Sequence, residues 1–172
     1  MRLAVLLALV PAVAAADPAD RDTTEVVAGA GVVVASYQNK TTVDPAVVFR
    51  LGYGRLLRSD FAMSLELSDT ISLHPIADGH EVENSLGLAI GAQVWLQPDL
   101  FVGASGGIAH GTTNSYDGVS PSGFTALGRV GYVLSRDDQS VKTASFAFTH
   151  TWLDPGPGSL NAILVQLGFQ FL

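Results

Sequence analysis

The chain has 172 residues, of which 48% are hydrophobic and 15% charged, with 18 glycines and no cysteine. Because cysteine is absent, disulfides, thiolate metal sites, cysteine nucleophiles and a lipidated N-terminal cysteine are excluded. The net charge of −7 argues against nucleic acid as a partner, since that partner requires a basic surface. The mean hydropathy of +0.33 is high for a soluble domain, yet no apolar run reaches the ~20 residues of a membrane-spanning helix.

The N-terminus has the pattern of a secretory signal peptide. Arg2 supplies a positive charge, residues 3–13 are an apolar core, and residues 14–16 are three alanines before Asp17. The core is too short for an anchor helix that spans a bilayer. We therefore expect residues 1–16 to be a cleaved signal peptide and residues 17–23 to be a short periplasmic tail.

Eight segments of strand character follow. In most of them apolar residues alternate with small or polar ones, which is the period of a strand. The last segment shows this well, because its alternate residues from Ile163 to Phe171 are all apolar while Gln166, Gly168 and Gln170 lie between them. The predicted strands are residues 24–37, 45–57, 61–73, 85–96, 100–112, 123–134, 141–153 and 163–172.

The connections between these segments alternate strictly between short and long. The short turns are residues 58–60, 97–99 and 135–139, and the longer loops are residues 38–44, 74–84, 113–121 and 154–159. In an up-and-down barrel, alternate connections emerge at opposite ends, and outer-membrane barrels have short periplasmic turns and longer external loops. An even number of strands places both ends of the barrel on the short-turn side.

The face opposite the apolar one distinguishes a membrane barrel from a soluble one. A soluble, lipocalin-like barrel would carry many Lys, Glu and Asp on its water-facing positions. Here those positions are mainly Gly, Ala, Ser, Thr and Gln, which suit the narrow interior of an eight-stranded barrel. The sequence therefore predicts an all-β fold, an eight-stranded antiparallel up-and-down transmembrane β-barrel over residues 24–172, with the lipocalin-like barrel as the alternative.

With its leader, eight alternating strands, loop asymmetry and GFQFL end, the chain resembles the small eight-stranded bacterial outer-membrane proteins of the A and X type. That family usually ends on an aromatic residue, which Phe169 and Phe171 match and Leu172 extends by one. The resemblance implies an outer-membrane location, lipids and lipopolysaccharide as partners, and recognition of the C-terminal strand by the barrel assembly machinery. It also implies no cofactor, no catalysis, and a structural or adhesive role through the external loops.

Three charged residues are predicted to face the barrel interior. Arg50 and Glu66 share the parity of the small residues, and Arg129 does the same in a later segment. Folding the second and third strands about Ser59 makes Arg50 and Glu66 diagonal neighbours. We expect an interior ion-pair cluster that fixes the register; a gated proton or ion path is the functional alternative.

Aromatic residues near strand ends are expected to anchor the barrel at the two membrane interfaces. These candidates are Tyr37, Trp152, Phe169 and Phe171. Trp95 has inward parity and fits that role less well.

The histidines offer two further hypotheses. His74, His80, His110 and His150 all fall near the predicted external rim, but none has a tight metal-motif spacing, so no metal site is predicted. Some outer-membrane barrels deacylate lipid A with a Ser, a His and a Glu, and His150 could match that base. Trp152 stands where the Ser is expected and the last strand has no Glu, so no catalytic residue is predicted.

Overall fold

A computed structural model describes residues 21–37, 40–76, 79–112, 122–154 and 158–171, which form a closed antiparallel β-barrel. Each strand pairs with its neighbours in the chain, and β1 pairs with β8 to close the cylinder. No helix among these residues is both long and apolar enough to cross a membrane. The strands are β1 (Arg21–Tyr37), β2 (Lys40–Arg58), β3 (Phe61–Ile76), β4 (Gly79–Gln97), β5 (Leu100–Thr112), β6 (Ser122–Arg136), β7 (Ser140–Asp154) and β8 (Gly158–Phe171).

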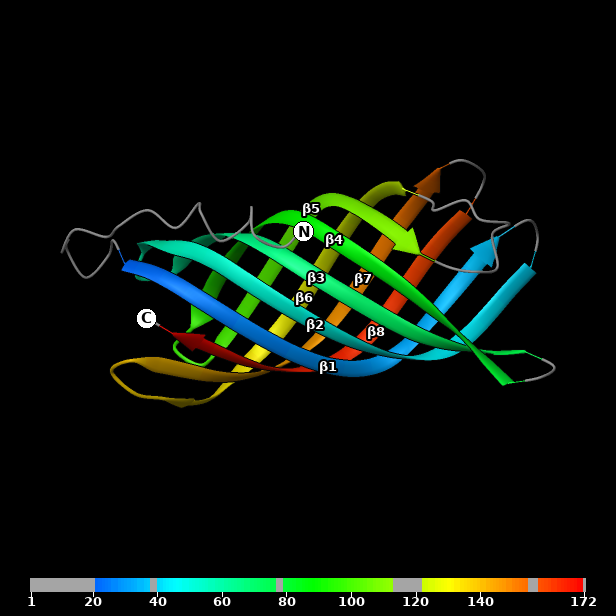
Figure 1. Cartoon of the computed structure of the whole chain (residues 1–172). Helices are drawn as coiled ribbons and strands as arrows, with labels where there is room; N and C mark the ends of the chain where they lie inside the picture. Colours follow the sequence, from blue (N-terminus) through cyan, green and yellow to red (C-terminus); the bar gives the residue numbers. More distant parts are fainter. Residues whose placement is uncertain (1–20, 38–39, 77–78, 113–121, 155–157, 172) are drawn as a thin grey trace, which may run out of the picture.

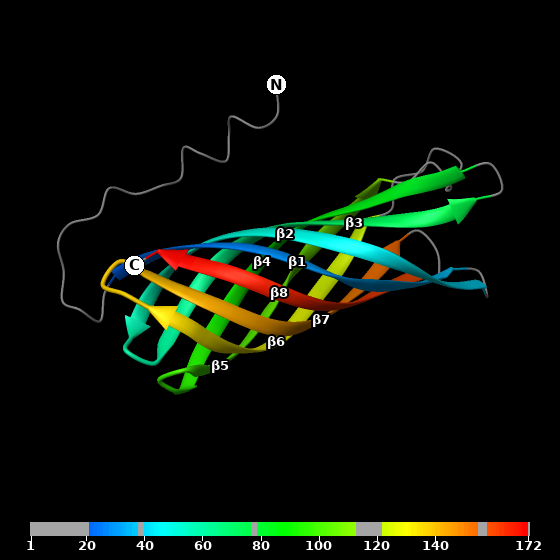
Figure 2. The same ribbon diagram turned by 90° about the horizontal axis from the view of Figure 1, so that it is seen from below.

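The two ends of the barrel differ. At one end lie the start of β1, the end of β8 and the turns between β2 and β3, β4 and β5, and β6 and β7 (Figures 1 and 2). The other four connections lie at the opposite end, which we call the long-connection end because the predicted longer loops fall there. With the strands extended, only residues 113–121 separate two strands by more than three residues at that end. Each of the three turns is accompanied by a register shift in its hairpin, at Leu56/Arg58, Trp95/Gln97 and Val133/Ser135. Bulges of this kind are common at barrel rims, where they increase the local twist.

Apolar side chains cover the outside of the barrel. Leu65, Leu88 and Val165 are 44%, 37% and 64% exposed, and all three point away from the axis. Small and polar residues of the opposite parity line the interior, among them Ser72, Thr143 and Gln166. A lipocalin-like barrel would have these two faces exchanged, so the predicted sidedness is confirmed and the soluble alternative is not.

Several strands are longer than predicted. β2 begins at Lys40, so most of the expected loop 38–44 is strand, and β3 and β4 pair as far as Ile76 and Gly79 within the expected loop 74–84. β8 begins at Gly158 rather than at residue 163. The predictions were wrong here because they followed apolar alternation. Backbone pairing continues beyond the apolar belt, where polar residues serve equally well.

The N-terminal predictions are only partly covered. The expected signal peptide 1–16 lies outside the described residues, as do residues 17–20 of the expected tail. β1 begins at Arg21, so residues 21–23 are strand and not tail, because they pair with residues 54–56 of β2.

The backbones of β1 and β8 approach each other very closely at one point of their pairing. A Cβ atom added at Gly31 would collide with the backbone carbonyl of Ile163. Glycine is therefore required there by the approach of two backbones, at the pairing that closes the barrel.

Candidate functional site

A layer of charged side chains crosses the interior in the half of the barrel nearer the short turns. Glu25 on β1 accepts hydrogen bonds from Arg129 Nη1 on β6 at 3.0 and 2.9 Å. Arg50 Nη2 on β2 donates to the same carboxylate at 3.5 Å. Arg129 Nη2 donates to Gln93 Oε1 at 2.8 Å and lies 3.8 Å from Glu66 Oε1. We call Glu25, Arg50, Glu66, Gln93 and Arg129 the ionic layer.

Glycines on the interior face make room for these long side chains. A Cβ at Gly103 would lie 2.7 Å from Arg129 Nε, and one at Gly91 would lie 2.5 Å from Glu66 Oε1. In a cylinder of eight strands the interior is just wide enough for side chains to fill it. The small residues that alternate with the outer apolar face are thus the physical condition for an interior ion-pair layer.

The ionic layer is charge-balanced but not fully hydrogen-bonded. Its two glutamates and two arginines carry no net charge between them, and Arg50 and Glu66 are only 3% and 4% exposed. Within the described part of the chain, Arg50 Nε and Nη1 have no hydrogen-bond partner. The desolvation of four ionised groups offsets much of their attraction, so the layer contributes more to register than to net stability.

Two features of the interior border the ionic layer. Beside it lies a cavity of about 20 Å³, lined by Glu25, Gln93 and Arg129 among others, which is room for about one water molecule. Toward the long-connection end, buried apolar side chains pack together along the wall formed by β7, β8, β1 and β2. They are Val33, Ala35, Ala46, Val48, Ala147, Ala162 and Leu164.

The structure places the predicted interior residues as follows. Arg50 pairs with Ser68 and Gly52 with Glu66, which is the register expected from the turn at Ser59. Arg129 is also buried, at 8% exposure. However, Arg50 donates to Glu25, and Glu25 and Gln93 were not predicted to take part. The sequence did indicate an inward position for Glu25, because Glu25 has the same parity in its strand as Gly29 and Gly31.

The histidines at the long-connection end each have a separate partner. His74 Nδ1 lies 3.1 Å from Asp44 Oδ1, and His110 Nδ1 lies 2.8 Å from Ser122 Oγ. His150 Nδ1 lies 2.6 Å from Asn161 Oδ1. No three His, Asp or Glu side chains gather as potential metal ligands in the described ranges, and the side chain of His80 lies outside them.

The described contacts of His150 differ from those of a Ser–His pair. Its hydrogen-bond partner is an amide, and its ring makes an edge contact with Trp152 at a centroid distance of 4.2 Å. A serine nucleophile would have to bond to one of the imidazole nitrogens. Among the described residues, none with a hydroxyl group is bonded to His150.

The predicted aromatic anchors point outward near the ends of their strands. Trp152 lies near the long-connection end and is 53% exposed, whereas Phe169 and Phe171 lie near the short turns and are 46% and 50% exposed. The ammonium group of Lys142 lies 5.9 Å from the centroid of Phe169. The side chain of Tyr37 lies outside the described part. Their role at a membrane interface stays a prediction.

Comparison with known proteins extends this description of the fold. The attachment invasion locus protein of Yersinia pestis, solved with the heparin analogue sucrose octasulfate, is similar with a TM-score of 0.62 and 13% identity, over 87% of this chain and 99% of that one. Neisserial surface protein A is similar with a TM-score of 0.57 and 11% identity, over 84% and 95% of the two chains. No protein-family model matches the sequence, and neither does any curated protein.

The chain thus has the fold of the small eight-stranded outer-membrane barrels, as its sequence pattern indicated. Identities this low show common architecture alone.

Proposed function

We propose that this chain is a non-enzymatic outer-membrane protein whose eight strands span the bilayer. The observation that carries this proposal is the belt of outward apolar side chains on a closed barrel, with charged groups in the interior. Among the described residues, twenty-nine large hydrophobic side chains are exposed, including Phe49, Ile90 and Phe146. Exposing such an apolar surface to water is unfavourable, whereas the hydrocarbon of a bilayer requires an apolar surface.

The proposed topology rests on the predicted loop lengths and on the long connection at residues 113–121, which lies at the end opposite to the start of β1 (Figure 1). The short turns face the periplasm, and the long connections face outward. Residues 1–16 direct export, and the C-terminal strand with Phe169 and Phe171 presents the chain to the barrel assembly machinery. Outer-membrane lipids and lipopolysaccharide surround the belt.

A structural or adhesive role suits this barrel better than transport. In the described part of the barrel, the side chains of the ionic layer cross the narrow interior and leave a cavity of only about 20 Å³ beside them, which favours a barrel that does not pass solutes. Contacts with ligands would then fall to the external connections, which is where barrels carry specificity.

The charge of the external connections restricts the ligand. The connections and strand ends at the long-connection end, residues 38–44, 74–84, 113–121 and 154–159, contain one lysine, no arginine and six acidic residues, of which Asp44 is buried. A surface of this sign repels polyanions and favours neutral or cationic ligands. The proposed ligand class therefore differs from the sulfated saccharide bound by the Yersinia protein.

Heat-modifiable migration tests the barrel in its proposed location. An outer-membrane fraction from cells that express the full chain is run on gels unboiled and boiled. We expect the unboiled protein to migrate at a different position, because a compact barrel resists the detergent until it is heated. Recovery of the protein only in the soluble fraction would contradict the proposal.

A loop replacement tests the adhesive role. Residues 113–121 are replaced with a glycine–serine segment of equal length, and cell adherence is compared with that of the unaltered chain. We expect adherence to fall while heat-modifiable migration is kept. Equal adherence of cells with and without the protein would exclude an adhesive role and leave a structural one.

A further inference from the structure

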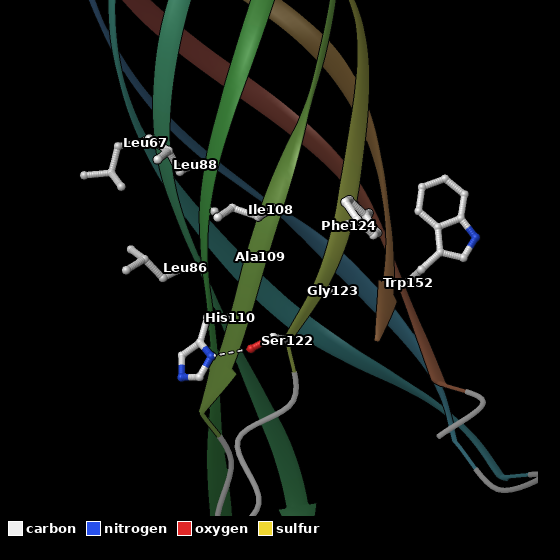
Figure 3. Close-up of a pocket in the computed structure, with 11 residues that line it drawn as sticks. Leu67, Leu86, Leu88, Ile108, Ala109, His110, Ser122, Gly123, Phe124 and Trp152 are labelled. Atoms are coloured by element: carbon white, nitrogen blue, oxygen red, sulfur yellow. Dashed lines mark hydrogen bonds between the residues drawn. The ribbon is translucent and has the colours of Figure 1, made fainter. Parts of the chain in front are cut away.

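A groove of about 730 Å³ crosses the outer face of the barrel over β3 to β7. Its apolar wall is one continuous cross-strand row, in which each member pairs directly with the next. Phe124 is 70% exposed, the highest value among the large hydrophobic residues of the described chain. The row consists of Leu67, Leu88, Ile108, Phe124 and Trp152 (Figure 3).

Two polar side chains lie at the end of this groove nearest the long connections. His110 and Ser122 are paired across β5 and β6, and Ser122 Oγ lies 2.8 Å from His110 Nδ1. When the serine hydroxyl donates to Nδ1, the neutral imidazole carries its proton on Nε2. In Figure 3 this second nitrogen is turned away from Ser122. In that tautomer the groove ends in an outward hydrogen-bond donor.

We propose that this groove binds one acyl chain of a membrane lipid. The imidazole of His110 donates a hydrogen bond to the ester or amide carbonyl where that chain joins its headgroup. This inference rests on the proposed function, since it needs the belt to face lipid. Pockets of about 300–1,000 Å³ with a mostly apolar wall and a few polar groups are typical small-molecule sites.

Three features favour a lipid over other occupants. The groove is continuous with the apolar belt, so a lipid of the surrounding bilayer reaches it without leaving the membrane. The groove is apolar along its wall and polar at one end, and an acyl lipid likewise has an apolar chain that ends in a polar carbonyl. Asp69 lies in the same cross-strand row as His110, so a neutral carbonyl suits this end better than an anionic group.

Trp152 offers a direct reporter of lipid in the groove. The chain has two tryptophans, and Trp95 faces inward, so the Trp95→Phe variant leaves Trp152 as the single fluorophore. This variant is reconstituted in phosphatidylcholine vesicles whose acyl chains carry bromine, which quenches tryptophan on contact. Unbrominated diester phosphatidylcholine is then compared with its dialkyl ether analogue, which has no carbonyl groups, as a competitor.

We expect the ether lipid to restore the fluorescence about fivefold less effectively, the loss that corresponds to one hydrogen bond. His110→Leu in the same background should abolish this difference. Asn84→Leu is the matched control, because Asn84 lies on the same outer face of β4 and does not line the groove. It should keep the difference. Equal competition by both lipids in the unaltered groove would overturn the proposal.

A second reporter separates failure of this site from failure of the proposed function. Val165→Trp, with Trp95 and Trp152 replaced by Phe, places the fluorophore on the belt outside the groove, where Val165 is 64% exposed. Quenching at position 165 but not at Trp152 would mean that protein covers the groove, which overturns the lipid site alone. No quenching at either position would overturn the membrane barrel as well.

Discussion

At the scale of single residues, Glu25 has the central place in the interior. Its carboxylate accepts hydrogen bonds from Arg129 and Arg50, which come from β6 and β2 on different sides of β1. Glu66, by contrast, lies 3.8 Å from Arg129 and accepts its shorter hydrogen bond, 3.1 Å, from Ser64. Removing one charge from a buried pair leaves its partner uncompensated. The two glutamates should therefore differ in their contribution to stability.

Glu25→Gln should lower the free energy of unfolding by about 3 kcal/mol, because two buried guanidinium groups lose their shared acceptor charge. Glu66→Gln should lower the free energy of unfolding by less and should leave membrane conductance unchanged. Urea unfolding of the protein in lipid vesicles, followed by tryptophan fluorescence, measures the free energy of unfolding of both variants. An equal or larger loss for Glu66→Gln would contradict this assignment of roles.

Asp137 should make the turn between β6 and β7 sensitive to acid. The backbone N–H groups of Gln139 and Ser140 and the hydroxyl of Ser140 donate to its carboxylate. These bonds, first that from the Gln139 backbone, hold the pKa of Asp137 below its ordinary value of 3.8. A lowered folded-state pKa means that the stabilisation is present above pH 3.8 and is lost as the pH falls through the folded value.

The test compares Asp137→Asn with the unaltered chain in urea unfolding from pH 6 to pH 2.5. The unaltered chain should be the more stable of the two at pH 6, and the difference should shrink below pH 3.8. A difference that is the same across the whole range would show that Asp137 titrates equally in the folded and unfolded states.

At the scale of elements, closure depends on the contact between β1 and β8. Gly31→Ala should prevent close pairing of these strands, because the added Cβ would occupy the position of the Ile163 carbonyl. We expect most of the protein to lose its heat-modifiable form. Gly128→Ala is the control, since a Cβ there meets nothing within 4 Å. Normal folding of the Gly31 variant would show that the seam can relax.

At the scale of the whole molecule, the distribution of charge predicts what the outer end does not bind. Among the connections and strand ends of the long-connection end, residues 38–44, 74–84, 113–121 and 154–159, acidic residues outnumber lysine six to one. The purified barrel should therefore pass through a heparin column at physiological salt without retention. Retention that is reversed by higher salt would mean that the external surface is not acidic as a whole.

A filled interior predicts that the barrel does not conduct. Planar bilayer recordings of the reconstituted protein should show no sustained current, because the ionic layer leaves a cavity of about 20 Å³ beside it. A variant that combines Glu25→Ala with Arg129→Ala removes two of the side chains that span the interior and is the test of this explanation. It should pass more current than the unaltered barrel.

Local sequence pattern was enough to predict the number of strands, their antiparallel order, the sidedness of each strand and the register between β2 and β3. These properties follow from local alternation and turn length, because a strand places successive side chains on opposite faces. The true ends of β2, β3, β4 and β8 were missed, because backbone pairing beyond the apolar belt leaves no periodic signal.

Which interior charges meet depends on how the barrel closes. Glu25 and Arg129 are 104 residues apart in the chain, and their contact exists because the closed cylinder brings β1 and β6 across a narrow interior. The groove also depends on the tertiary structure. Its row of five side chains comes from five strands, and these side chains are neighbours only because each strand pairs with the next in the observed register. Alternation determines which side of the wall a residue faces, whereas closure and register decide its neighbours.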